Sequence, residues 1–472
     1  MPLRTPDAYI ASLRDGRCVY YRGQRVVDVV SDEILGIAVR HAAIDYEMAE
    51  DPKYRDLAVA DGYSRYFHVP RTADDLLARS RLIEQATRLG RTLVVLIKEI
   101  GTDALFSLMV SAQRLGGPYP ERVRRFYEQC RDGDLAMAVA QTDVKGDRSL
   151  APSAQPNKDA YLRIVERRAD GIVVRGTKCH TSVSVNANEL IVLPTRQLSE
   201  ADADYAVAFA VPMNTPGLIL VASPYLGRSD HDQFEHPITS RHKMVETTTV
   251  FRDVFVPWER VFQCGEWQEA GPLARGFVEF HRFTAISYKL PLVDALVGSA
   301  IAMARLNGIA GASHVREKIA WLITYAETLR ALTQHAAEKC QIVDPVGIAV
   351  PDTLLVNIAK LRFAEDFHTA LMHVQDLAGG LTVTAPAQED FSDPDYGDFL
   401  RRAYAGANGE GLARIRMAKL VSELTTGEFG GYQAVLAIHA EGSLEAERLT
   451  ILREYDARSA SELVEWMARP GD

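Results

Sequence analysis

The chain has 472 residues, and its 63 acidic and 53 basic side chains give a formal net charge of −10. Hydrophobic residues make up 47% and charged residues 25%, which is typical of globular proteins and excludes collagen-like, disordered and disulfide-stapled classes. The excess of acid argues against a nucleic-acid partner, because phosphate binding needs clustered Lys and Arg. Five widely spaced cysteines, no apolar leader and no apolar run of ~20 residues predict a cytoplasmic protein without a membrane span.

The first part of the chain is predicted to be helical, because apolar residues between Thr72 and Gln129 recur at steps of three and four. After about residue 136 the pattern changes to short runs rich in β-branched and aromatic residues, which predicts strands. The predicted strands cover residues 162–167, 171–176, 188–194, 205–212 and 247–257.

The last part of the chain is predicted to be helical again. Long amphipathic segments cover residues 293–305, 313–343, 353–377, 411–426 and 445–467. The order of helices, strands and helices predicts three domains, 1–135, 136–275 and 276–472, and argues against a doubly wound sheet. We find no GxGxxG or GxxxxGK[ST] motif, so Rossmann and P-loop nucleotide sites have no support.

Two polar segments flank the first predicted hairpin. Residues 141–153 (QTDVKGDRSLAPS) combine hydroxyls, both signs of charge and a Gly/Pro-containing loop that can present donors to a phosphate or a polar heterocycle. From their spacing alone, a capped surface turn is favoured. Residues 175–182 (RGTKCHTS) are rich in donors but also fit a polar strand end. Two such segments at one hairpin favour a shared ligand cleft.

Several histidines are candidates for chemistry. His281 lies near the predicted start of the last helical region, and an unperturbed pKa near ~6.5 suits an imidazole for acid–base work if it faces a pocket. Residues 439–443 (HAEGS) mark a helix break that is either part of a site or an ordinary pair of caps. A solvated loop is favoured over a metal site for the irregularly spaced set His231, Asp232, His236 and His242.

These segments, in this order, resemble the flavoprotein family of 4-hydroxyphenylacetate 3-monooxygenases and 4-hydroxybutyryl-CoA dehydratase. The resemblance is strongest over residues 142–155 and continues through 162–166, 170–176, 255–257, 281–282, 378–381 and 442–443. It implies an α+β fold similar to acyl-CoA dehydrogenase, with N-terminal helices, a middle β-barrel and a C-terminal helical bundle. It also implies a homotetramer with FAD between barrel and bundle.

The resemblance further assigns residues to FAD. The barrel side would supply Thr142, Asp143, Arg148, Ser149, Ala151, Pro152, Ser153, Thr177, Lys178, His180, Thr181 and Ser182. The bundle side would supply Gly379, Gly380, Gly442 and Ser443, with the first two reaching FAD of the same or a neighbouring subunit.

The chain departs from the family at positions that matter for chemistry. The dehydratase holds a four-iron four-sulfur cluster with three cysteines and one histidine, and this chain has Val95, Glu99, Tyr288 and His281 at those positions. Because such a cluster needs thiolates, we expect neither a cluster nor another metal, and elimination of water loses its Lewis acid. The phenol hydroxylases carry an Arg and a Tyr near the segment that reads IGTDA here, residues 100–104, where this chain has neither.

These comparisons leave a flavin site without a cluster. The leading hypothesis is an FAD-dependent monooxygenase that receives reduced flavin from a separate reductase and oxygenates a small organic substrate. The alternative is a cluster-free lyase or isomerase acting on an acyl-CoA-type thioester, in which His281 takes an α-proton and Glu246 and Lys289 assist. Tyr288 would add a hydroxyl to either pocket. A ligand-binding scaffold that has lost its catalytic activity is the third interpretation.

Overall fold

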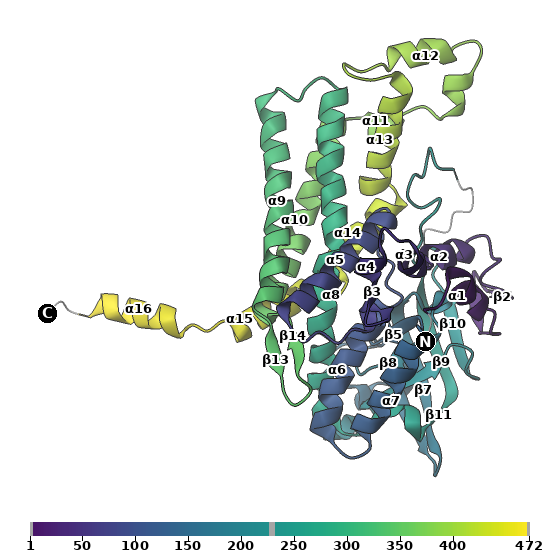
Figure 1. Ribbon diagram of the computed structural model, residues 1–472, viewed down its shortest axis with the longest axis vertical. Helices are drawn as coiled ribbons and strands as arrows, with labels where there is room; N and C mark the ends of the chain where they lie inside the picture. Colours follow the sequence, from purple (N-terminus) through teal and green to yellow (C-terminus); the bar gives the residue numbers. More distant parts are fainter. Residues whose placement is uncertain (1–2, 226–231, 470–472) are drawn as a thin grey trace.

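The computed structural model describes residues 3–225 and 232–469 (Figure 1). Three long helices dominate the N-terminal part: α5 (Ala73–Leu89), α6 (Glu99–Leu115) and α7 (Tyr119–Asp132). A capping box between Thr72 and Asp75 starts α5. Shorter elements precede them: α1 (Pro6–Ser12), β1 (Val19–Tyr21), β2 (Gln24–Val26), α2 (Leu35–Ala42), α3 (Ile44–Glu50), α4 (Arg55–Ala58), β3 (Val59–Ala60) and β4 (Tyr63–Ser64).

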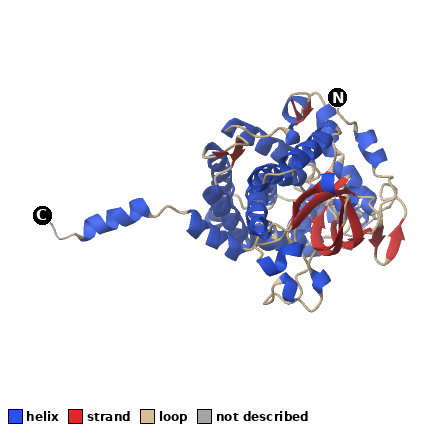
Figure 2. Ribbon diagram, turned by 90° about the horizontal axis from the view of Figure 1, so that it is seen from below, coloured by secondary structure: helices blue, strands red, loops and turns tan. Residues whose placement is uncertain are grey.

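The middle of the chain forms two sheets, which Figure 2 shows gathered on one side of the helices. One has six strands in the order β2-β1-β10-β11-β7-β6, and the other has four in the order β12-β9-β8-β5. The first strand of the chain, β1, pairs in parallel with β10 and so ties the N-terminal segment to the barrel region. The strands are β5 (Met137–Ala140), β6 (Arg163–Arg167), β7 (Gly171–Ser182), β8 (Glu189–Val192), β9 (Val207–Pro212), β10 (Leu218–Ala222), β11 (Glu246–Pro257) and β12 (Val261–Cys264).

All five predicted strands are present, with one change that matters for the site. The donor-rich segment 177–182 is not a loop but the second half of β7, which pairs with β11 along its length. Strands β5, β10 and β12 were not predicted, and each is only four or five residues long.

The C-terminal part is a bundle of long helices, seen as upright columns in Figure 1. The helix carrying His281 begins earlier than expected, at Trp267, so His281 lies well inside it. The helix predicted over 313–343 ends at Glu338 and is followed by a small hairpin. The elements are α8 (Trp267–Leu306), α9 (Ser313–Glu338), β13 (Gln341–Val343), β14 (Ile348–Val350), α10 (Thr353–Ala378), α11 (Leu381–Thr384), α12 (Gly397–Ala403), α13 (Gly411–Thr425), α14 (Glu428–His439), α15 (Leu444–Glu454) and α16 (Arg458–Ala468).

The helix predicted over 445–467 is two helices. It breaks after α15, where Tyr455 is extended and the Asp456 carboxylate accepts a hydrogen bond from the Arg458 backbone N–H at 3.1 Å to start α16. The three proposed domain boundaries stay predictions, but the order of helices, sheets and helices is that of the predicted α+β fold.

One helix of the described chain, α8, is long and apolar enough to cross a membrane by length and composition alone. Most of its side chains are buried, and it packs against α5, α6, α9 and α10. A helix that is apolar nearly all round is expected at the centre of a large bundle, which accounts for its composition.

The histidines of the 231–242 segment do not share one environment. His231 lies outside the described residues, and Asp232 caps the backbone N–H groups of Phe234 and Glu235. Within residues 3–225 and 232–469 no group of three or more His, Cys, Asp or Glu is placed to hold a metal. The expectation of a solvated loop is wrong for His242, which is partly buried.

His242 faces the buried His41 of α2, with the two Nδ1 atoms 3.2 Å apart. The Nε2–H of His41 donates to the Val94 carbonyl at 2.9 Å, so His41 Nδ1 accepts the proton that His242 Nδ1 donates. Burial lowers the pKa of His41 to about 4, and burial together with His41 and the nearby arginines Arg91 and Arg241 lowers the pKa of His242 to about 3. Both imidazoles are therefore neutral in the folded protein.

We expect this pair to make the protein less stable in mild acid. An unfolded histidine gains its proton near pH ~6.5, whereas the folded pair resists protonation until about pH 4, so stability is full above 6.5 and falls as the pH drops toward 4. The expected slope is up to about 1.4 kcal/mol per pH unit for each histidine. Urea unfolding at pH 7, 6 and 5 measures it. His242→Gln should remove about half of the slope, exposed His335→Gln none, and an equal slope in all three proteins would refute the assignment.

Candidate functional site

The predicted catalytic residues meet where the bundle faces the barrel, around Glu441, which the sequence marked only as part of a helix break. The Tyr288 hydroxyl donates to one Glu441 carboxylate oxygen, and Lys289 Nζ lies 2.6 Å from the other. Glu441 lies between α14 and α15 in the left-handed backbone region, at φ 57°. The helix break noted in the sequence is therefore a turn that points a carboxylate at α8.

The ionisable groups around the Glu441 turn shift one another's pKa values. Burial raises the pKa of Glu441, but Lys289, Lys360 and His281 outweigh it and hold the pKa at about 2. Burial also lowers the pKa of Lys289 to about 8 against the opposing pull of Glu441. The pKa of Tyr288 is raised well above its usual value by burial and by Glu441. At neutral pH the turn thus holds an ionised carboxylate and a neutral phenol.

Glu246 approaches the same place from the barrel, at the start of β11. Its carboxylate accepts hydrogen bonds from Ser182 Oγ at 2.9 Å and from the Tyr432 hydroxyl at 3.0 Å. Burial raises its pKa, the two hydroxyls oppose this rise, and Glu441 adds to it. The pKa of Glu246 is thus raised and that of Glu441 is lowered. Such a pair of carboxyl groups can provide one proton donor, Glu246, and one group that stays ionised, Glu441.

His281 is oriented by a buried carboxylate. Its Nδ1 lies 3.1 Å from an oxygen of Asp103, and the other Asp103 oxygen accepts from Arg79 at 2.7 Å and from Thr284 Oγ1 at 3.0 Å. The imidazole stacks on Phe277, with ring centroids 5.2 Å apart. Because Nδ1–H donates to Asp103, the lone pair of the neutral imidazole is on Nε2. Nε2 has no hydrogen-bond partner among the described residues.

On the barrel side, a buried ion pair fixes the loop expected to hold FAD. Lys178 Nζ lies 3.0 Å from Asp143 and also donates to the carbonyls of Gln141 and Leu193. Asp143 in turn accepts the backbone N–H of Leu162 at 2.9 Å. These two predicted cofactor residues therefore hold the loop against the sheet and are not free to contact a ligand with their charges.

Three cations gather on the outer side of this loop: Lys145, Arg148 and Arg196. Arg196 is brought to the loop by its neighbour Thr195, whose hydroxyl donates to the Gln141 carbonyl at 2.6 Å. Burial lowers the pKa of Lys145, and the two arginines lower it further. None of the three forms an ion pair with a described residue. In a chain of net charge −10 such a group fits a phosphate or pyrophosphate. Lys145 and Arg196 were missed from sequence, because lysine and arginine are common at exposed loops.

The remaining barrel-side residues fall into two groups. Exposed side chains that a ligand can reach are those of Arg148, Ser149, Ala151 and His180. Residues placed by contacts within the protein are Thr142, Pro152, Ser153, Thr177, Thr181 and Ser182. Among these, Ser153 Oγ donates to Asp202 at 2.7 Å, and the Thr142 carbonyl accepts from Cys179 N–H at 2.9 Å. Their roles toward FAD stay predictions.

The glycines predicted to bind FAD from the bundle side lie in two different regions of the bundle. Gly442 follows Glu441 at φ +122°, and a Cβ there would lie 2.3 Å from the Arg282 guanidinium, so only glycine fits. Ser443 caps α15. Gly379 and Gly380 are exposed at the end of α10, about 28 Å along the helix from Lys360, so within one chain they do not adjoin the Glu441 turn. Their contact with FAD of a neighbouring subunit stays a prediction.

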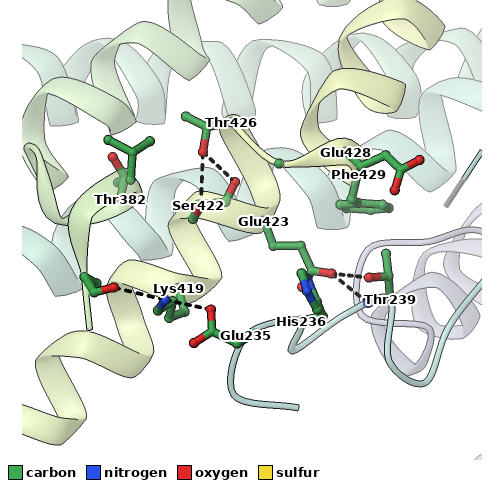
Figure 3. A pocket seen from close by; sticks show the side chains of 13 residues that line it. Glu235, His236, Thr239, Thr382, Lys419, Ser422, Glu423, Thr426, Glu428 and Phe429 are labelled. Carbon is green, nitrogen blue, oxygen red and sulfur yellow. Dashed lines mark hydrogen bonds and ion pairs between the residues drawn. The ribbon is translucent and has the colours of Figure 1, made fainter. Parts of the chain in front are cut away.

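A cavity of about 340 Å³ lies beside α11, α13 and α14 (Figure 3). None of the expected catalytic or FAD-binding residues lines it, but His236 of the histidine set named from the sequence does. Its polar side chains are engaged with one another: Glu423 accepts from the backbone and hydroxyl of Thr239, and Lys419 lies 2.6 Å from Glu235. Its lining contains no residue of the Glu441 turn, although Glu235 Oε1 is buried there without a hydrogen-bond partner among the described residues.

Comparison with known proteins decides the family. Residues 5–263 match the family model described as the N-terminal part of 4-hydroxyphenylacetate 3-hydroxylase, and residues 270–469 match its C-terminal part. The chain belongs to the 4-hydroxyphenylacetate 3-hydroxylase family. The family expected from the sequence is thus confirmed, and so is the acyl-CoA dehydrogenase-like fold class.

Two kinds of hydroxylase-family relative stand out. The chain is 31% identical to a 4-hydroxybutyryl-CoA dehydratase/vinylacetyl-CoA-Δ-isomerase of Clostridium aminobutyricum over 99% of each chain. It is 29% identical to the oxygenase component of a 4-hydroxyphenylacetate 3-monooxygenase of Thermus thermophilus over 91% of this chain and 90% of the relative. The expected enzyme class, a flavin-dependent oxidoreductase of the two-component type, agrees with the oxygenase relatives.

Solved structures similar to this chain include the same two kinds of enzyme, a dehydratase and an oxygenase component. An oxygen-tolerant archaeal 4-hydroxybutyryl-CoA dehydratase from N. maritimus superposes with a TM-score of 0.92 at 28% identity, covering 99% of this chain and 96% of the other. The oxygenase component of 4-hydroxyphenylacetate 3-monooxygenase complexed with FAD superposes with a TM-score of 0.91 at 27% identity, covering 99% and 98%. The expected cofactor, FAD, agrees with this relative.

The three positions where the resemblance implies cluster cysteines in the dehydratase carry side chains with other contacts in this chain. Val95 is fully buried in the core. Glu99 is fully buried near Asp45, and burial raises the pKa of both carboxyls, which favours their neutral forms. Tyr288 is bonded to Glu441. None of the three offers a thiolate to iron.

Proposed function

We propose that this chain is the oxygenase component of a two-component flavin monooxygenase, which takes reduced FAD from a separate reductase and oxygenates a small organic substrate. The observation that carries the proposal is the Tyr288–Glu441 hydrogen bond, which engages one of the three positions where the resemblance implies a cluster cysteine with a carboxylate of this chain. The names of several relatives support it, since they are oxygenase components of 4-hydroxyphenylacetate and 4-nitrophenol monooxygenases.

In this proposal one group of residues binds the cofactor and another residue transfers a proton. Lys145, Arg148 and Arg196 would hold the FAD pyrophosphate beside β7. When bound, reduced FAD supplies two electrons, so that one atom of O₂ enters the substrate and the other leaves as water. His281 Nε2, held by Asp103, is placed to accept a proton from the substrate.

The proposal also includes a reductase partner, an oligomeric state and a cellular location. The chain has no legible NAD(P)H motif, which supports delivery of reduced flavin by a separate reductase. A homotetramer and a cytoplasmic location, both expected from the sequence, remain parts of the proposal.

Isotope labelling tests the reaction. The protein is mixed with FAD, an NADH-dependent flavin reductase, ¹⁸O₂ and a panel of phenols and other small aromatics. We expect one ¹⁸O atom in the product and oxygen uptake coupled to product formation. If every candidate leaves only hydrogen peroxide, at the rate seen without candidate substrate, the monooxygenase proposal fails.

The second candidate is an isomerase acting on an acyl-CoA-type thioester. The identity to the dehydratase/isomerase favours it, together with an imidazole positioned by Asp103 as a base. Vinylacetyl-CoA incubated with the protein and FAD in D₂O should then gain deuterium at the α-carbon, and His281→Ala should abolish the exchange. Exchange at the uncatalysed rate would eliminate this candidate.

A further inference from the structure

A second buried lysine, Lys360, lies beside the Glu441 turn and has no part in the reaction described so far. Its side chain is fully buried inside α10, and its ammonium donates to the Ala437 carbonyl of α14 at 3.0 Å. The same nitrogen lies 3.4 Å from a carboxylate oxygen of the fully buried Glu447 on α15. Lysine is rarely buried completely, and replacing a buried ion pair by apolar side chains is often neutral or stabilising. A buried ammonium beside the site therefore points to a role other than stability.

Lys360 and Lys289 share one oxygen of Glu441. Lys289 Nζ lies 2.6 Å from Glu441 Oε2, and Lys360 Nζ lies 3.9 Å from the same atom. The other oxygen, Oε1, accepts a hydrogen bond from the Tyr288 hydroxyl. Two ammonium groups that meet at one carboxylate oxygen repel each other, and this repulsion favours the loss of a proton from one of them.

The two lysines are not held equally. Lys360 has further partners in Glu447 and in a carbonyl of the last turn of α14, where the end of a helix is negative. Lys289 pairs with Glu441, and its ammonium otherwise lies over the Phe363 ring at 5.2 Å. Burial lowers the pKa of Lys289, Glu441 opposes this, and Lys360 lowers the pKa further, to about 8. Lys289 is therefore the lysine placed to exchange a proton near neutral pH.

The ionisable groups around Lys289 come from several elements. One set faces Lys289 itself from α8, α10, α15 and the turn, and a second set interacts with Glu441. The first set is Tyr288, Lys360, Glu441 and Glu447, and the second is His281, Arg282, Glu246 and Tyr432. Within the first set, Lys360 lowers the pKa of Lys289 and Glu447 raises it, so removing one or the other should have opposite effects.

We infer that Lys360 is a positioning residue, which competes with Lys289 for Glu441 Oε2 and so makes Lys289 Nζ the proton donor of the site. Oxygenation of a substrate R–H by O₂ and anionic reduced flavin consumes one proton and yields R–OH, oxidised flavin and water, so the site needs a donor besides the acceptor at His281. The proton leaves Lys289 Nζ, and the neutral amine takes up another from solvent in each turnover. This role rests on the proposed function for the fate of the proton, whereas the competition between the two lysines is a property of the protein alone.

The competition can be measured without FAD or substrate, as the pH at which Lys289 loses its proton in the folded protein. An unfolded lysine keeps its proton to about pH 10.4, whereas folded Lys289 loses it near pH 8. The unfolded chain thus binds more protons between these values, and stability rises with pH. Urea unfolding of the FAD-free protein from pH 7 to 10.5, each protein compared with the same protein carrying Lys289→Met, isolates this rise. In wild type the rise should begin near pH 8.

Two substitutions should move the start of this rise in opposite directions. Lys360→Met removes the competing charge and should raise it by about one pH unit, whereas Glu447→Gln removes an anion and should lower it by about half a unit. Lys360→Arg keeps the charge and should leave it within about half a unit of wild type. Val374→Ala is the control, since it opens a cavity in the same helix about four turns away and should leave the start of the rise unchanged.

The same starting pH in wild type, Lys360→Met and Glu447→Gln would overturn the inference, and if Lys360→Met does not fold, the result for Glu447→Gln decides. The rate of product formation is the second readout. Because a donor acts in its protonated form, the rate should fall above about pH 8 in wild type and about one unit higher in Lys360→Met. A fall at the same pH in both proteins would also overturn the inference. Opposite stability shifts in a protein that oxygenates none of the candidate substrates would contradict the oxygenase proposal and support the role of Lys360.

Discussion

Replacing Lys178 by Met should lower the free energy of unfolding by about 3–5 kcal/mol and weaken FAD binding about tenfold. Lys178 and Asp143 form a buried ion pair at 3.0 Å, and Lys178 also donates to the backbone carbonyls of Gln141 and Leu193. Without the ammonium, the Asp143 carboxylate is left buried with a net charge. The loss of FAD affinity follows because this pair holds the loop that carries Lys145 and Arg148.

Urea unfolding and fluorescence titration with FAD measure the two effects. Lys158→Met is the matched control, since Lys158 is exposed near the same loop, and its effect on stability should stay within about 0.5 kcal/mol. Asp143→Leu/Lys178→Met should be less destabilised than the sum of the single variants, because the two charges leave together. Additive single and double variants would show that the pair contributes no interaction energy, contrary to this account.

His281→Ala should slow product formation about 10²- to 10⁴-fold, while the Kd for FAD changes less than about twofold. The reason is that Nε2 is the one imidazole nitrogen left free by the Asp103 hydrogen bond, and the imidazole lies beside the Glu441 turn. Single-turnover kinetics, with FAD binding measured separately, distinguish a lost proton acceptor from a lost cofactor.

Two further variants grade the role of Asp103 as a positioning residue. Thr284→Val removes one hydrogen bond to Asp103 but leaves its charge, and should slow the reaction less than about tenfold. Asp103→Asn should slow it nearly as much as His281→Ala and alter the pH profile, because an amide does not fix the same tautomer. The exposed His335→Ala is the control. Full activity in His281→Ala would remove the imidazole from the reaction.

The order of helices and strands could be predicted because the spacing of apolar residues along the chain is a local property of the sequence. The runs at β6, β8 and β11 are rich in β-branched residues, and the structure confirms them. Polarity misled the prediction in the second half of β7, since residues such as Lys178 and Thr181 look like loop residues but are buried through pairing with distant groups. Propensity also favoured one helix where Tyr455 and Asp456 start a break.

The site was predictable only in part. The family resemblance placed Glu246, His281, Tyr288 and Lys289 in one site, and the structure brings them together. Glu441 was missed because nothing local distinguishes a glutamate at a helix break from one at a surface cap. The contact between Asp103 and His281 joins residues 178 positions apart, so no local pattern contains it. The cation group beside β7 depends on the same kind of distant contact, between Arg196 and the loop at Lys145.

The alternation along β7 has a practical consequence for redesign. Val174, Gly176 and Lys178 are buried, and a Cβ at Gly176 would lie 2.5 Å from the Leu162 backbone. Thr177 and Cys179 alternate with them and are only partly buried. The alternation ends at His180, which is exposed at φ 56°, and Thr181 beyond it is buried and bonded to Thr249. A mutant library aimed at new substrates can therefore randomise positions 177, 179 and 180 and leave 174, 176, 178 and 181 untouched, so that changes in selectivity are sampled without unfolding the scaffold.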